Sequence, residues 1–93
     1  MADFHSLSKD DRDTILQAYN VINTMGMEKI EYLKNYEVDP KRGFIWNEDE
    51  TILNIMYNIN EASNGMHSGS SLAFIMRWLQ YLVKNNITID SLS

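Results

Sequence analysis

GSSLAFIMRWLQYLVKN, residues 69–85, is the most apolar stretch of the chain and decides its fold. At about 100° per residue, a helix over this stretch gathers its aliphatic side chains on one side, which predicts a core-facing stripe. The stripe consists of Leu72, Ile75, Met76, Leu79, Leu82 and Val83. The opposite side carries Ser70, Phe74, Arg77, Tyr81 and Lys84. Asn85 and Asn86 end the helix, and residues 87–89 form either a docked tail or a short edge strand.

A second strongly apolar helix is predicted between Asn47 and the Asn64-Gly65 pair. Asn47 is its expected N-cap, and Glu50 occupies the capping-box position. The predicted core face consists of Ile52, Ile55, Met56, Ile59 and Ala62. Leu53 and Tyr57 lie on a second face, so this helix is either buried on two sides or offers an apolar strip to a partner.

Two more helices are predicted in the first half of the chain. The first begins at Ser8, an N-cap followed three residues later by Asp11, and it ends or kinks at Gly26. Its core positions are Ile15, Ala18, Tyr19 and Ile22. The second covers residues 27–37 and is weakly amphipathic. It turns Ile30 and Leu33 inward, and Glu28, Lys29, Glu31 and Lys34 outward.

Residues 39–46 connect these two halves. Asp39-Pro40 followed by Lys41-Arg42-Gly43 supplies turn chemistry. Residues 43–46 are apolar but too few for a helix, so we expect an extended segment or a short strand whose Phe44 and Trp46 plug the end of the bundle. The sequence thus predicts a single all-α domain over residues 1–93, a small bundle of about four helices with a short extended segment near residues 43–46.

The composition excludes several classes of protein. Apolar residues make up 44% of the chain and charged residues 23%, which is enough for a packed core. The chain has no cysteine, so a disulfide framework is excluded and a zinc site is not expected. Its net charge of −5 has the opposite sign to that of most duplex nucleic-acid binders. Without a signal peptide or an apolar run long enough for a membrane span, the expected location is the cytoplasm.

The segment His67-Ser68-Gly69-Ser70-Ser71 is the candidate binding site. Small hydroxyl residues and a glycine leave the first N–H groups of the last long helix unobstructed, and the helix dipole makes these groups attractive to an anion. The two other well-defined helix starts carry carboxylates in their first turns, whereas this one has none. The alternative is that Ser68 is an ordinary N-cap and that His67 hydrogen-bonds a backbone carbonyl.

Side chains further along the same helix are candidates to extend this site. Arg77 lies two turns beyond Ser70 on the same face and would add positive charge. Phe74 and Tyr81 either stack on the base of a ligand or form a second buried face of the helix.

A catalytic site is disfavoured by the same residues. His67 and Ser68 are adjacent in sequence, and neighbouring side chains seldom face each other well enough for a base to activate a nucleophile. Neither His5 nor His67 has a partner at metal-binding spacing. We therefore expect a non-catalytic binding protein with no cofactor and no metal, and we rank a small enzyme using His67 third.

The run His67-Ser68-Gly69-Ser70-Ser71 and the apolar helix after it resemble a motif in small proteins of tailed bacteriophages. The resemblance covers about 20 of the 93 residues. It implies a phage accessory protein in the host cytoplasm that binds and inhibits a host protein, such as an antiviral defence factor, through the last two long helices. The alternative function is sequestration of a phosphate-containing small molecule, such as a nucleotide, between the subunits of a homo-oligomer.

Overall fold

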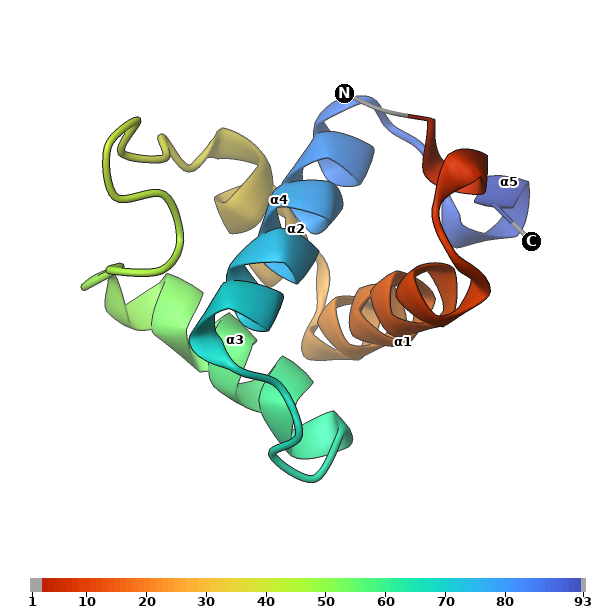
Figure 1. Ribbon diagram of the computed structural model, residues 1–93. Coiled ribbons are helices and arrows are strands. Elements are labelled where there is room, and N and C mark those ends of the chain that lie inside the picture. The colour runs from red at the N-terminus through yellow and green to blue at the C-terminus, as the bar shows by residue number, and fades with distance from the viewer. Residues whose placement is uncertain (1–2, 93) are drawn as a thin grey trace.

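Helix α4 (Gly69–Lys84) runs through the middle of the molecule, and the other long helices pack around it (Figure 1). It contacts α1 (Lys9–Met25), α2 (Met27–Asn35) and α3 (Glu50–Ala62). The most apolar segment of the sequence is therefore the central element of the fold, as expected from its need to bury a wide apolar surface.

The computed structural model describes residues 3–92. A 3-10 helix, η1 (Phe4–Ser6), precedes α1, and a short helix, α5 (Ile89–Leu92), ends the described chain. Every regular element of these residues is helical, which confirms the predicted all-α bundle with four main helices. None of these helices combines the length and the apolarity that a bilayer span requires.

The core forms around the apolar stripe of α4. The predicted stripe is buried except at Leu72, which is half-buried. Ala73 and Trp78, outside this stripe, are also buried, because other helices pack against more than one side of α4. The other long helices contribute Ile15, Ala18, Tyr19, Ile22, Leu33, Ile52, Ile55, Met56 and Ile59. Ala62 was predicted to belong to the core, but it is exposed because it is the last residue of α3.

A buried side chain of α4 ends α2 earlier than the predicted end at Glu37. Tyr36 leaves the helix with an extended backbone, φ −71° and ψ 131°. The Nε2 group of Gln80 donates hydrogen bonds to the carbonyl oxygens of Leu33, at 3.1 Å, and of Tyr36, at 2.7 Å. The last turn of α2 therefore receives its hydrogen-bond partners from α4.

Residues 43–46 form turns, so the predicted extended segment is wrong. The Asp39 carboxylate accepts hydrogen bonds from the backbone N–H groups of Lys41 and Arg42, and Gly43 adopts a positive φ of 59°. These contacts coil the chain instead of extending it. Phe44 is buried as predicted, with 1% of its surface exposed, but Trp46 is 72% exposed and plugs nothing.

The N-cap of α3 is Asp49, not the predicted Asn47. The Asp49 carboxylate accepts from the N–H groups of Thr51, at 2.9 Å, and Ile52, at 3.0 Å. Asn47 instead accepts from Asp49 N at 2.7 Å and so stabilises the turn before the helix. Glu50 becomes the first residue of the helix and is not at the capping-box position.

The chain after α4 is a docked tail that contains a helical turn. Asn86 takes a positive φ of 55°, and α5 then buries Leu92. The hydroxyl of Tyr19 on α1 donates to the carbonyl oxygen of Ile87 at 2.7 Å, which fixes the tail against α1. Of the two alternatives predicted for residues 87–89, the docked tail is the one found.

Candidate functional site

The start of α4, where the sequence predicts an anion site, is capped by its own side chain. The Oγ atom of Ser68 accepts a hydrogen bond from Ser71 N at 3.2 Å. The start of α1 has the same geometry, with Ser8 Oγ accepting from Asp11 N at 3.1 Å. Ser68 therefore acts as an ordinary N-cap. The first turn of α4 contains no acidic residue, and an anion site at its amides stays a prediction.

His67 is held by its backbone rather than by its side chain. Its N–H group donates to Oδ1 of Asn60 at 3.2 Å, which ties the loop after α3 to the last turn of that helix. Neither His67 nor Ser68 lines the groove that follows. Residues 3–92 contain no group of three or more histidine or carboxylate side chains arranged to hold a metal ion.

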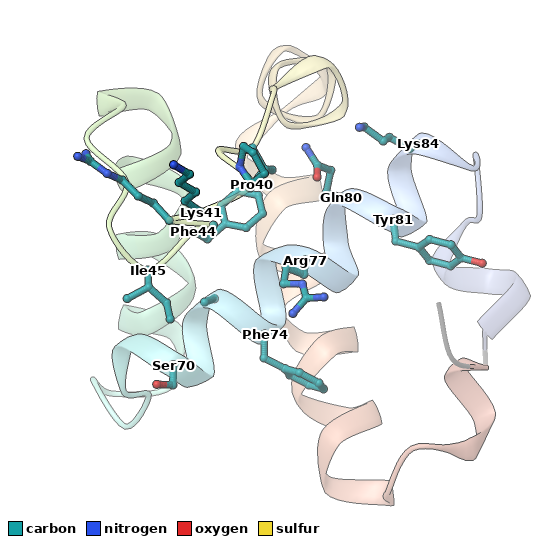
Figure 2. Close-up of a pocket in the computed structure, with 14 residues that line it drawn as sticks. Pro40, Lys41, Phe44, Ile45, Ser70, Phe74, Arg77, Gln80, Tyr81 and Lys84 are labelled. Carbon is teal, nitrogen blue, oxygen red and sulfur yellow. The ribbon is translucent and has the colours of Figure 1, made fainter.

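A groove lies between the outward face of α4 and the loop of residues 38–45, and Figure 2 shows the side chains that line it. Its volume is about 820 Å³. The helix contributes its predicted outward residues Ser70, Phe74, Arg77, Tyr81 and Lys84, together with Ala73 and Gln80. The loop contributes Val38, Pro40, Lys41, Arg42, Gly43, Phe44 and Ile45. The structure thus brings Arg77 and the two candidate stacking residues together, but it leaves His67, Ser68, Gly69 and Ser71 outside the groove.

The groove concentrates positive charge. Four of the chain's eight Lys and Arg residues line it, and these are Lys41, Arg42, Arg77 and Lys84. All thirteen Asp and Glu residues lie within residues 3–92, and none of them lines the groove. The salt bridge found within residues 3–92 joins Lys9 to Asp13, so none of the four groove cations forms a salt bridge with a carboxylate of these residues. A chain with net charge −5 therefore has a groove that carries four positive charges and no negative one.

Asp39 orders the loop that supplies two of these cations. Hydrogen bonds from the backbone N–H groups of Lys41 and then Arg42 lower the pKa of the Asp39 carboxyl below its ordinary value, and the charge of Arg42 acts in the same direction. Asp39 is thus ionised at neutral pH and holds both residues at the mouth of the groove. It offsets part of the charge of Arg42 from outside the groove lining.

Side chains with heptad spacing form three lines along this face of α4. The lines are Ala73 with Gln80, Ser70 with Arg77 and Lys84, and Phe74 with Tyr81. The first line is buried and forms the floor on the helix side. Figure 2 shows Arg77 between Phe74 and Tyr81. Cations on the loop and on the helix therefore flank a floor made of a small apolar side chain and a carboxamide.

The two aromatic rings of the outer line differ in exposure. Phe74 is 36% exposed. Tyr81 is half-buried, and its ring meets that of Trp78 edge to face with 5.7 Å between the centroids. The prediction left open whether these rings form a second buried face. Phe74 does not, whereas Tyr81 packs in part against the core.

The apolar residues that the sequence placed on the second face of α3 are exposed. Tyr57 is 63% exposed and Leu53 is 43% exposed, so α3 is not buried on two sides. Trp46, in the turn before the helix, is also exposed. Neither Leu53 nor Tyr57 lines the groove, whereas Trp46 shares a smaller hollow with Arg42 and Ile45, which do line it.

Sequence reasoning missed Lys41, Arg42 and Gln80. In the sequence, Lys41 and Arg42 indicate a turn. Two adjacent cations in that turn are the one feature that could have indicated a positively charged site. Gln80 gave no signal, because its position beside α2 and the loop depends on how the helices pack.

No protein-family model matches this chain, and no curated protein or solved structure matches it either. Its function is therefore inferred from the groove and the exposed side chains.

Proposed function

We propose that the chain is a non-catalytic binding protein that holds a phosphate-containing small molecule in the groove between α4 and the loop of residues 38–45. The observation that carries this proposal is the set of four cations that line the groove without a carboxylate in the lining. Phosphate oxygens are strong acceptors for the N–H donors of Arg and Lys. The volume of about 820 Å³ lies within the range of small-molecule sites.

The net negative charge of the chain does not oppose this function. Charges on a protein surface are screened over about 8 Å at physiological ionic strength, so acidic residues on distant faces contribute little in the groove. Groups at its edge contribute most, and these are Lys41 and Arg42 on one side and Arg77 and Lys84 on the other. An anion that enters the groove thus meets a field of the favourable sign.

The proposed site is not the one that the sequence predicted at the start of α4. The proposed site lies further along the helix, away from the Ser71 amide that Ser68 caps and closer to Arg77. Ser70 belongs to both sites, because it is in the first turn of α4 and also lines the groove. A non-catalytic role is supported by the position of His67 outside the groove and by the use of Ser68 Oγ as a cap.

Binding of a host protein is the second candidate function. The exposed side chains of Trp46, Tyr57 and Leu53 favour it, because large aromatic residues are enriched at the centres of protein interfaces. The resemblance to small bacteriophage proteins points the same way. Tyr57 and Leu53 do not line the groove, so a variant distinguishes the two functions: Tyr57→Ala would abolish capture of a host protein and leave phosphate binding unchanged.

Thermal unfolding in the presence of inorganic pyrophosphate tests the leading proposal. A ligand that binds only the folded chain stabilises it by RT ln(1 + [L]/Kd), so the unfolding temperature should rise with pyrophosphate concentration. Arg77→Ala and Lys41→Ala should each weaken binding by about tenfold, as expected for the loss of a charge-assisted hydrogen bond. Lys29→Ala is the matched control, because it removes one positive charge outside the groove. No stabilisation by pyrophosphate or by a nucleoside diphosphate, each at about 100 times a Kd of about 1 μM, would refute the proposal.

A further inference from the structure

Gln80 offers an unpaired acceptor to the groove. Its side chain is buried, with 9% of its surface exposed. The two backbone carbonyls beside it require a donor, so the amide nitrogen must face them and the carbonyl oxygen Oε1 must face away. Oε1 accepts no hydrogen bond from residues 3–92. No fully buried side-chain nitrogen or oxygen of these residues lacks a partner, so Oε1 reaches accessible surface, and the groove is the surface that Gln80 lines.

An acceptor among four cations selects between ligands. A fully ionised phosphate has only acceptor oxygens, and these are repelled by the carbonyl oxygen of a carboxamide. A ligand that carries a hydroxyl or N–H group beside its phosphate satisfies both the cations and Gln80. The floor of the groove therefore favours a phosphate ester of a hydroxylated or nitrogen-bearing molecule over a bare inorganic anion.

The outer line of α4 adds two aromatic rings. Phe74 and Tyr81 flank Arg77 in Figure 2, and the ring of Phe74 is partly exposed. Aromatic side chains stack on nucleobases with little regard to their sequence. We propose, building on the proposed function, that the ligand is a mononucleotide. Its phosphates contact Arg77 and the loop cations, a hydroxyl or N–H group donates to Gln80 Oε1, and its base lies against Phe74.

A single nucleotide fits this site better than a strand does. The groove carries four cations within a chain whose net charge is −5, and the basic stripe typical of proteins that track a nucleic-acid backbone is missing from the lining. Residues of the groove extend only from Ser70 to Lys84 on the helix side. Affinity should therefore not grow with the length of an oligonucleotide.

Calorimetric titration of the wild-type chain with ADP, GDP, ribose 5-phosphate and inorganic pyrophosphate tests the inference. At least one nucleoside diphosphate should bind about tenfold or more tightly than pyrophosphate, because it adds the stacked ring and the donor to Gln80. Equal affinity for pyrophosphate and both nucleotides would overturn the inference and leave the proposed function standing. Failure of every ligand to bind would overturn both. Tighter binding of single-stranded oligonucleotides of increasing length would replace the mononucleotide with a strand.

Phe74→Ala then assigns the contribution of the ring. It should remove most of the preference for the nucleotide over pyrophosphate, because in the proposed arrangement the Phe74 ring contacts the base and no phosphate. Tyr57→Ala is the matched control, since it removes an exposed ring outside the groove, and it should change neither affinity. Phe74→Leu provides a second variant with an apolar side chain of intermediate size. An unchanged ratio of nucleotide to pyrophosphate affinity in both Phe74 variants would overturn the assignment of the base to Phe74.

Discussion

The carboxamide of Gln80 and the backbone carbonyl of Tyr36 are joined by a hydrogen bond of 2.7 Å that links the central helix to the end of α2. The same amide group also donates to the carbonyl oxygen of Leu33 at 3.1 Å. This contact ends α2 and positions the chain that enters the loop of residues 38–45. One side chain therefore stabilises the fold and forms part of the groove floor.

Replacing Gln80 with Leu should lower the free energy of unfolding by about 1 to 3 kcal/mol, because two carbonyls at the end of α2 lose a buried donor. Urea denaturation followed by circular dichroism measures this change. Gln17→Leu is the control, because Gln17 Nε2 donates to Ala62 O in an exposed site and its loss should cost less than about 1 kcal/mol. Equal losses in the two variants would contradict a special role for the buried amide.

Phe44 and Trp46 should respond very differently to truncation, although they are two residues apart. Phe44→Ala should cost about 3 to 5 kcal/mol, because its buried ring packs in the core. Trp46→Ala should change the free energy of unfolding by less than about 0.5 kcal/mol, because its side chain is mostly in solvent. The same denaturation experiment measures both. A loss at Trp46 comparable to that at Phe44 would mean that Trp46 does plug the end of the bundle.

The cap of α3 should make stability depend on pH. A hydrogen bond from the Tyr32 hydroxyl, followed by those from the backbone N–H groups of Ile52 and Thr51, lowers the pKa of the Asp49 carboxyl below its ordinary value. The ionised carboxylate is thus favoured in the folded chain over the unfolded one. Its contribution to stability is present above the ordinary pKa and is lost as the pH falls below about 4.

Tyr32→Phe tests this dependence, because it removes the largest cause of the lowered pKa. The variant should be less stable than the wild type at neutral pH, and the difference should shrink at a pH well below about 4, as the pH falls through the lowered pKa of Asp49. Tyr57→Phe is the control, since that side chain is exposed and its hydroxyl donates no hydrogen bond to residues 3–92. A difference between Tyr32→Phe and wild type that is the same at both pH values would contradict the assignment to Asp49.

Most of the fold could be predicted from the helical periodicity of the apolar residues. The helical spacing from Leu72 to Val83 identified a buried helix. The predicted cap at Ser8 is confirmed, and at Ser68 the structure shows the alternative of an N-cap, because a cap depends on residues within one turn. The α3 cap was misplaced because Asn47 and Asp49 are both good caps. The structure uses both, one for the turn and one for the helix.

The groove could be predicted only in part, because it joins segments that are far apart in the sequence. The outward side of α4 was identified from its spacing, and it includes Arg77 and Phe74. Lys41 and Arg42 line the groove, and the Asp39 carboxylate coils the loop that carries them through two backbone hydrogen bonds. A sequence shows that Asp39-Pro40 favours a turn, but which helix that turn lies against depends on the packing of the whole bundle.

The last prediction concerns ionic strength, because the salt dependence of the Kd distinguishes binding through charged groups from binding through apolar contacts. If the four groove cations hold the phosphates of a nucleotide, the Kd should rise severalfold between about 0.05 M and about 0.5 M salt, since the Debye length falls over this range. Arg77→Ala should bind more weakly at low salt and show a shallower dependence, because fewer charges are left to screen. Lys29→Ala should keep the wild-type dependence, as its ammonium group lies outside the groove. A Kd that does not change with salt would mean that the cations of the groove do not contact the ligand, and binding would then have to arise from the rings of Phe74 and Tyr81 alone.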